Sequence, residues 1–189
     1  MKHIKIIVGF SLLMNFLQCK AQQIYSLNTN YETIPNYSYL KDIDNELQAF
    51  TGTYKSNYQG NEITLFITKV DHELEVRAKK SYYTDILVVK YIIKNPSGTV
   101  LQDTQNSTSM KNVIRSMGTM AEFNAVGFHY TGTNCNVGNG IIYLRKIDSN
   151  QIYWDYRPNS MILDQQNCPG NQDTKVYLPA TKDLIFTKQ

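Results

Sequence analysis

Residue types that perform chemistry are sparse in this sequence, and few have the spacing that a site requires. The two histidines beyond residue 21, His72 and His129, lie in separate segments, without a cysteine or histidine at zinc-site spacing. Glu73 and Glu75 stand two positions apart, and a pair of carboxylates can do acid–base work on a sugar. Because "HELEVR" alternates charged and apolar residues, we interpret the glutamates as a solvated strand face. A hydrolase is therefore only the third function that we consider.

Other catalytic and cofactor signatures do not occur in the sequence. Asp155 lies between two aromatic residues and could pair with Arg157 at a rim. There is no G-x-S-x-G elbow. Gly138 and Gly140 form a "GNG" that lacks the lysine and the helix of a phosphate loop, and no acidic cluster favours calcium there. We predict no catalytic residue, no metal site and no cofactor, and expect that the protein is not an enzyme.

The pattern of residues 1–21 is typical of a secretory signal peptide, with a positive start and the apolar run "IIVGFSLLMNFL". The run is too short to cross a bilayer, which takes about 20 residues. Two interpretations of its end are open. In one, Cys19 and Ala21 form a small-residue cleavage site and the mature chain begins at Gln22. In the other, Cys19 is lipidated as in bacterial lipoproteins, although Gln18 is a poor match before the cysteine. Both predict export to the periplasm, the envelope or the extracellular space.

The charge distribution constrains the partners. The chain has 19 basic and 16 acidic residues, for a net charge of +3. Lys2, Lys5 and Lys20 all lie in the leader, which has no acidic residue, so the mature chain is neutral. A neutral chain of mixed charges lacks the basic surface that binds nucleic acid. We expect no nucleic-acid partner, and membrane contact only through a lipid on Cys19.

Residues 22–189 fit a single domain, in which a lead-in over residues 22–50 precedes an all-β region over residues 51–189. Two apolar patterns have helical spacing and predict two short helices. The first ends the lead-in, and the second interrupts the β-region, where Gly118 can terminate it. Their apolar positions are, in order, Leu40, Ile43, Leu47 and Phe50, and then Met110, Val113, Ile114 and Met117.

From residue 51 onward, short runs with period-two alternation are separated by turn signals. Gly60-Asn61 predicts a two-residue hairpin turn, "NPSG" a type I turn, and Asp148-Ser149-Asn150 a third turn. A long loop over residues 158–182 precedes a last strand, "DLIFTK". About nine strands in sequential hairpins favour an antiparallel barrel, because closure removes exposed sheet edges.

Cys135 and Cys168 are predicted to form a disulfide. Cys19 is removed from pairing by cleavage or by lipidation, so two cysteines remain in an oxidising compartment. Cys135 lies in the loop between "FNAVGFHYT" and "GIIYLRKI", and the chain returns along "QIYWDYR" before it reaches Cys168. Both loops should therefore lie at the same end of the barrel. Two free thiols, or a pair that binds metal, are the alternatives.

Some segments resemble known families. "GTY" at residues 52–54 opens the first strand where lipocalins have glycine, any residue and tryptophan, although tyrosine replaces the tryptophan here. The chain as a whole, from the leader through "SYLKDIDNELQAFTGTY" to "LIFTKQ", resembles a family of short, secreted, all-β bacterial proteins of unknown function. The resemblance implies a lipocalin-like antiparallel β-barrel and carries over no catalytic residue.

The sequence supports two binding hypotheses. In the first, an exported, non-catalytic protein of the cell envelope holds a small apolar or amphipathic ligand inside the barrel. In the second, the protein is an interaction module or inhibitor that binds an envelope protein through the loops and the tyrosine-rich lead-in (Tyr25, Tyr31, Tyr37 and Tyr39). An empty apolar cavity would favour the first hypothesis, and a filled barrel the second. The expected ligand-binding residues are Tyr91, Phe128, Tyr130 and Trp154.

Overall fold

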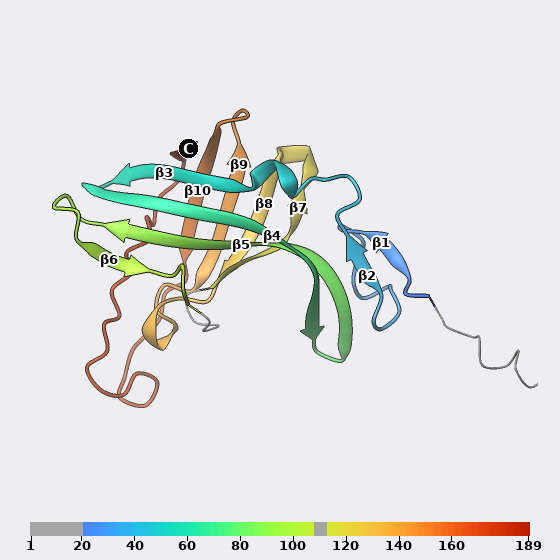
Figure 1. The fold of residues 1–189 in the computed structure, drawn as a ribbon. Coiled ribbons are helices and arrows are strands. Elements are labelled where there is room, and N and C mark those ends of the chain that lie inside the picture. Colours follow the sequence, from blue (N-terminus) through green and yellow to red (C-terminus); the bar gives the residue numbers. More distant parts are fainter. Residues whose placement is uncertain (1–20, 108–112) are drawn as a thin grey trace, which may run out of the picture.

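The computed structural model describes residues 21–107 and 113–189, which form an all-β structure (Figure 1). Residues 1–20, which include Cys19 and nearly all of the expected leader, lie outside the described residues. In the part that is described, the helical elements are the 3-10 turns η2 (Gln48–Phe50), η3 (Ala121–Phe123) and η4 (Asn134–Asn136), and no helix is long and apolar enough to cross a membrane. The strands are β1 (Ile24–Ser26), β2 (Tyr39–Lys41), β3 (Gly52–Tyr58), β4 (Asn61–Arg77), β5 (Lys80–Lys94), β6 (Val100–Asp103), β7 (Ile114–Met120), β8 (Ala125–Tyr130), β9 (Gly140–Lys146), β10 (Gln151–Pro158) and β11 (Leu184–Lys188).

Eight of the described strands close into an antiparallel barrel, which confirms the predicted all-β antiparallel barrel. β3, β4 and β5 are followed around the ring by β7, β8, β9, β10 and β11, each paired with the next. The pairing of Lys188 with Tyr54 joins β11 to β3. Turns lie at or next to the three predicted positions, and all connect antiparallel neighbours. The first lies one residue earlier than predicted, at Gln59-Gly60, because Asn61 already pairs with Tyr58. Closure leaves no barrel strand with a fully unpaired edge.

Large side chains fill the barrel interior. Alternate residues of each strand point inward, as the period of two requires. Nine large apolar and aromatic residues at such alternate positions belong to one buried cluster. These residues are Leu65, Ile67, Leu87, Val89, Tyr91, Phe128, Leu144, Trp154 and Phe186.

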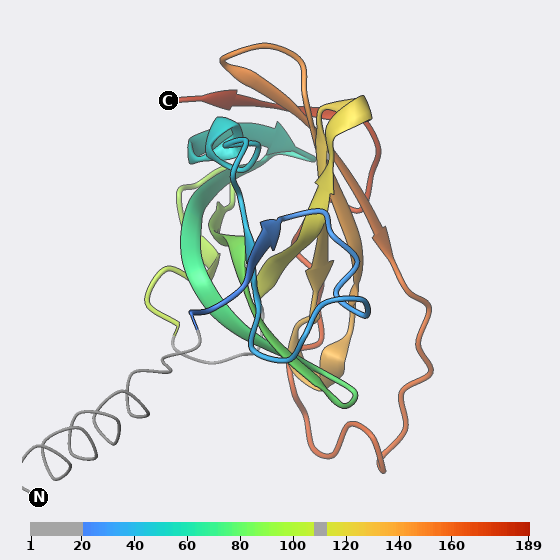
Figure 2. The ribbon, with the colours of Figure 1, turned by 90° about the vertical axis from the view of Figure 1, so that its right-hand side faces the viewer.

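The β4–β5 hairpin extends beyond the barrel, and the lead-in is attached to this extension. Tyr39 of β2 pairs in parallel with Tyr83 of β5, and Ile24 of β1 pairs in parallel with Tyr39. The result is a four-stranded sheet in the order β4-β5-β2-β1, which we call the hairpin sheet. Figure 2 shows the lead-in, in blue, crossing the barrel at this end.

A buried group of polar side chains fixes the lead-in to the barrel, and we call it the polar clasp. The Tyr39 hydroxyl and the backbone N–H groups of Asp42 and His72 all donate to the Asp85 carboxylate. The Lys69 ammonium lies 3.3 Å from a carboxylate oxygen of Asp42 and 3.7 Å from one of Asp85. Both aspartates are buried. The clasp pairs these charges, which would be costly to bury alone.

The prediction of a helix at the end of the lead-in is wrong. Leu40 belongs to β2, which pairs with the exposed edge of β5, and Ile43 is solvent-exposed. Asn45 has a φ of 55°, which interrupts a helix. Only the 3-10 turn η2 remains, and Leu47 and Phe50 still enter the core. The pairing of β2 with β5 overrides the helical periodicity.

The prediction of the second helix is also wrong. Ile114 begins strand β7 and faces the barrel interior. Met117, in the same strand, is exposed. Barrel closure requires a strand between β5 and β8, and β7 supplies it. Residues 108–112, which include Met110 and part of the expected helix start, lie outside the described residues.

Candidate functional site

The four aromatic residues expected to bind a ligand lie together inside the barrel, and they contact one another or the barrel wall. The hydroxyl oxygens of Tyr91 and Tyr130 are 3.2 Å apart, and Trp154 Nε1 donates to the carbonyl of Pro179 at 2.9 Å. Trp154 also packs against Phe186, with ring centroids 5.7 Å apart. Burial raises the pKa of both tyrosines, so both hydroxyls stay protonated. Phe128 is completely buried as well. Side chains, rather than free volume, occupy this part of the interior.

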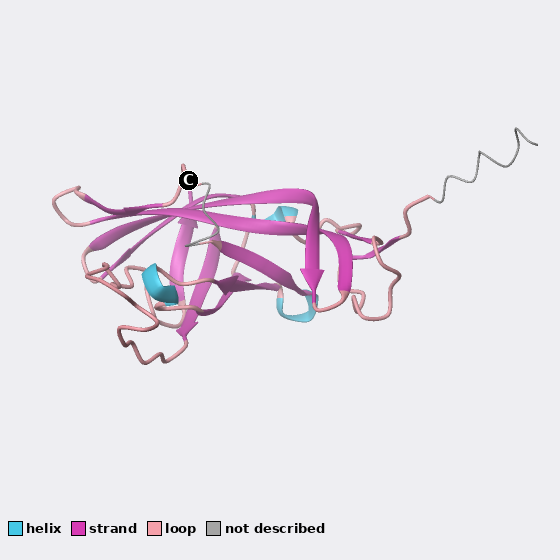
Figure 3. Ribbon diagram, turned by 90° about the horizontal axis from the view of Figure 1, so that it is seen from below, coloured by secondary structure: helices cyan, strands magenta, loops and turns pink. Residues whose placement is uncertain are grey.

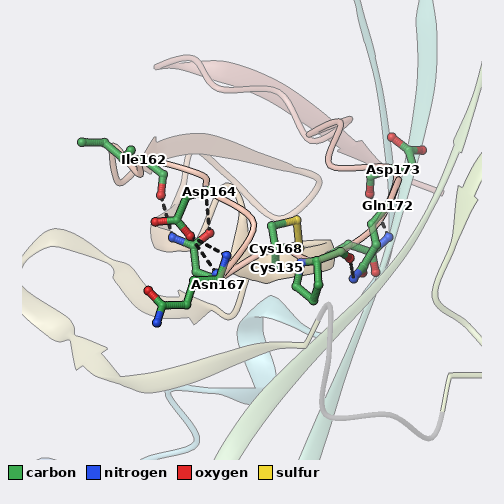
Figure 4. The surroundings of a disulfide bond; sticks show 10 residues. Cys135, Ile162, Asp164, Asn167, Cys168, Gln172 and Asp173 are labelled. Atoms are coloured by element: carbon green, nitrogen blue, oxygen red, sulfur yellow. Dashed lines mark hydrogen bonds between the residues drawn. A yellow bond between two sulfur atoms is a disulfide. The ribbon is translucent and has the colours of Figure 1, made fainter.

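The predicted disulfide is present. Cys135 and Cys168 are bonded, with 5.3 Å between their Cα atoms (Figure 4). Cys135 lies in η4 between β8 and β9, and Cys168 lies in the long connection between β10 and β11. The two connections meet at one end of the barrel, as the strand directions predict. The cross-link therefore fixes the middle of a connection that has no strand of its own.

Beside the disulfide, residues 161–168 are held by hydrogen bonds within the loop, and we call this segment the display loop (Figure 4). The Asp164 carboxylate accepts from the backbone N–H groups of Gln166 and Asn167 at 2.9 Å each. The Asn167 side chain donates to the Ile162 carbonyl at 2.9 Å and accepts from the Asp164 N–H at 3.0 Å. The Cys168 N–H donates to the Asp164 carbonyl at 2.9 Å. The side chains and the disulfide thus restrict the conformation of this loop.

The display loop exposes three consecutive apolar side chains. Met161 and Leu163 are each 41% exposed, and Ile162 is 86% exposed. A single exposed apolar residue is ordinary, whereas apolar residues exposed together can mark an interaction surface. Such a loop can insert an apolar side chain into a partner's pocket with little loss of conformational freedom. Sequence reasoning missed these residues, although "MIL" stands out in a polar loop.

A cleft lies where β5 and β7 separate. β7 pairs with β5 only at Val88 and Val89. Beyond that point lies a cleft of about 280 Å³, lined by the end of β7, the start of β5 and residues 27–31. Tyr31 stacks on Tyr82 at its edge, and the Arg77 guanidinium lies over the Tyr31 ring. The polar and aromatic groups of this cleft already contact each other.

The glutamate pair does not form the expected solvated face. A guanidinium nitrogen of Arg115 lies 2.6 Å from a Glu75 carboxylate oxygen and 3.2 Å from one of Glu73. The Glu75 side chain is only 23% exposed. The apolar neighbours Leu74 and Val76 are the exposed residues instead. The cause is a bulge in β4 between Val70 and Glu73, which turns the following residues to the opposite faces.

The other residues that the sequence analysis considered for catalysis or metal binding, His72, His129 and Asp155, do not lie together in one site. The His72 ring stacks on Tyr83, and its Nε2 lies 2.9 Å from the Gln22 side-chain oxygen. His129 is exposed on β8, far along the chain from His72. Asp155 pairs with Arg157 at 2.9 Å, as the sequence suggests. Within residues 21–107 and 113–189, no three His, Cys, Asp or Glu side chains are grouped to hold a metal ion.

The tyrosines of the lead-in have largely structural contacts. Tyr39 belongs to the polar clasp, and Tyr31 stacks on Tyr82. The Tyr25 hydroxyl donates to the Gln23 side chain at 2.7 Å. Tyr37 is the exception, because its side chain is mostly exposed. The display loop therefore exposes more apolar side chain than these tyrosines do.

Comparisons with known proteins agree with the expected resemblance at the level of the family. Neither the curated proteins nor the solved structures gave a match. A model of the family of unknown function DUF6705 matches residues 1–189. The match covers the whole sequence, and the described part is an all-β barrel. The chain therefore belongs to the family of unknown function DUF6705.

Proposed function

We propose that the protein is an exported, non-catalytic interaction module in which a lipocalin-like barrel serves as a rigid scaffold for the display loop. The leader lies within residues 1–21 and is cut before either Cys19 or Gln22, residues 22–50 are the lead-in, and residues 51–189 are the barrel domain. The observation that carries the proposal is the exposed Met161-Ile162-Leu163 run, held in place by the Asp164–Asn167 hydrogen bonds and by the disulfide. The partner is a protein with an apolar pocket.

The filled barrel interior supports this proposal over a ligand held inside the barrel. A ligand among Tyr91, Phe128, Tyr130 and Trp154 would have to displace ring contacts and hydrogen bonds that these residues make to each other and to the barrel wall. Interiors packed to this degree resist even small changes in volume. A small apolar or amphipathic ligand therefore stays the weaker of the two binding hypotheses.

The chemistry of the chain also supports export. The leader pattern and a disulfide occur together, and disulfides persist mainly in oxidising compartments such as the periplasm or the extracellular space. A cytosolic protein would gain little from the Cys135–Cys168 bond, because its thiols would be kept reduced.

The test is site-specific photocrosslinking in the producing cells, with the probe at position 162 or, as a control, at position 100. Val100 is also an exposed apolar residue, but it lies on β6. We expect a defined adduct from position 162, which Ile162→Asp and Cys135→Ser/Cys168→Ser weaken and Val100→Asp leaves unchanged. The proposal fails if adducts are the same from both positions. Native mass spectrometry that finds a retained small molecule would restore the ligand hypothesis.

A further inference from the structure

The hairpin sheet has one face on which apolar side chains are exposed to solvent. Leu74, Tyr83, Tyr39 and Ile24 are successive register partners across its four strands, so their side chains lie on the same face. Val76 follows on this face of β4, two residues after Leu74. Tyr37 lies beside it, because its N–H donates to the Ser81 carbonyl and Ser81 pairs with Val76. We call the exposed members of this set, Ile24, Tyr37, Leu74 and Val76, the apolar face.

The exposure of this face is large. Its four side chains are 55%, 61%, 48% and 64% exposed, respectively. The bulge in β4 produces this arrangement, since it places Leu74 and Val76 on the face of Tyr83 and places Glu73 and Glu75 on the opposite face, beside Arg115. If this face contacted only water, charged glutamates would be more favourable there than Leu74 and Val76. The His72 ring lies on Tyr83 and Tyr39 in the middle of this face, and the exposed apolar residues on either side of it favour contact with an apolar phase.

The position of the face along the chain indicates what covers it. Ile24 is five residues from Cys19, the candidate site of lipidation. An extended chain spans about 3.4 Å per residue, so Ile24 lies within about 17 Å of a lipid on Cys19. Tyrosine is typical of the membrane interface, and Tyr37 lies in this face. Lys79 at the hairpin turn and Lys41 at the end of β2 add exposed positive charge nearby.

We propose that the apolar face rests on the lipid headgroup region of a bilayer, to which the chain is anchored through Cys19. This inference goes beyond the proposed interaction function, because it concerns the opposite end of the molecule. Figures 1 and 3 show β1 and β2 at one end and the long loop after β10 at the other. The apolar face and the display loop therefore lie in different parts of the molecule, so a protein partner can reach the display loop while the apolar face rests on the bilayer.

The first experiment measures the membrane affinity of the face itself. Every described strand lies between Ile24 and Lys188, so a chain that begins at Gln22 keeps the whole fold and lacks the lipid. This chain is floated with vesicles of phosphatidylethanolamine and phosphatidylglycerol. Leu74→Glu/Val76→Glu should lower the apparent lipid affinity by about tenfold or more, since two apolar contacts are lost and two charges are added. Val100→Glu/Ile185→Glu, two exposed apolar residues elsewhere, should leave it within about twofold.

A second experiment tests the anchor, and each outcome decides the proposal. The full chain is expressed with its leader, and the intact mass of the membrane-bound form is measured. The expected mass has an acyl modification at Cys19 that Cys19→Ser abolishes, and a mature form beginning at Gln22 would overturn the proposal. It is also overturned if the unmodified chain does not float, or if both double variants lose affinity equally. The proposal also fails if the chain does not float with vesicles but forms a dimer that Leu74→Glu/Val76→Glu dissociates and the control variant does not. That result would assign the face to a second copy of the chain.

Discussion

Trp154 is the residue on which the interior packing depends most. Its ring is completely buried, packs against Phe186 and Tyr156, and donates a hydrogen bond to Pro179. Trp154→Ala should lower the free energy of unfolding by about 3–5 kcal/mol, because it leaves a cavity in the core. Chemical denaturation measures the loss. Tyr153→Ala, the neighbouring change on the outer face, should cost clearly less, and equal losses would contradict the assignment of Trp154 to the core.

Asp85 makes the stability of the lead-in depend on pH. Burial alone raises the pKa of its carboxyl, but hydrogen bonds from Tyr39 and from two backbone N–H groups, together with Lys69, lower the pKa below its usual value. The charged clasp therefore stabilises the fold above the unfolded pKa of about 4, and this contribution is lost as the pH falls below it toward the folded pKa. Unfolding curves from pH 7 to pH 2 should show this loss, and Asp85→Asn should reduce it. An unchanged acid slope in the variant would exclude Asp85 as its source.

Individual residues were predictable from sequence to different degrees. The Cys135–Cys168 pair followed from strand direction, and the inward aromatic residues followed from period-two alternation. The inversion at Glu73 and Glu75 did not, because a single bulge changes every later position and leaves no clear mark in composition. The exposed Ile162 was missed because an apolar residue in a long loop is usually read as a minor core contact.

At the scale of elements, the display loop depends on its cross-link. Cys135→Ser/Cys168→Ser should lower the free energy of unfolding by about 3–4 kcal/mol in the chain-entropy model, given a separation of 33 residues. Chemical denaturation of the variant and of reduced wild-type protein should give the same reduced value. If reduction leaves the unfolding midpoint unchanged, the disulfide does not restrain the loop in the way proposed.

The β-hairpins were the most predictable elements, because Gly60, the "NPSG" turn and Asp148 mark their ends locally. The two expected helices failed because their strands are defined by distant partners. β2 forms because the β5 extension has a free edge, and β7 forms because the barrel needs a strand between β5 and β8. Both segments carry apolar residues at helical spacing, so only the tertiary pairing distinguishes strand from helix.

For the whole molecule, the arrangement of the two ends relates the two proposals. The hairpin sheet and the apolar face lie at the end where the chain enters the barrel, and the display loop lies at the other (Figure 1). Between them the interior is packed with aromatic side chains. Under the two proposals together, such a barrel would hold the display loop at a fixed distance from the bilayer.

Barrel closure by β11 should be essential to the entire fold. β11 pairs with β10 through Ile152↔Phe186 and with β3 through Lys188↔Tyr54, and Phe186 is completely buried. Deletion of residues 183–189 would leave β3 and β10 with unpaired edges and remove a ring that packs on Trp154. We expect the shortened chain to lose cooperative unfolding and to aggregate, as measured by denaturation curves and sedimentation. Deletion of Gln189 alone, which lies after the last strand, is the control and should stay soluble. A soluble, cooperatively unfolding chain without residues 183–189 would show that the sheet is stable as an open structure.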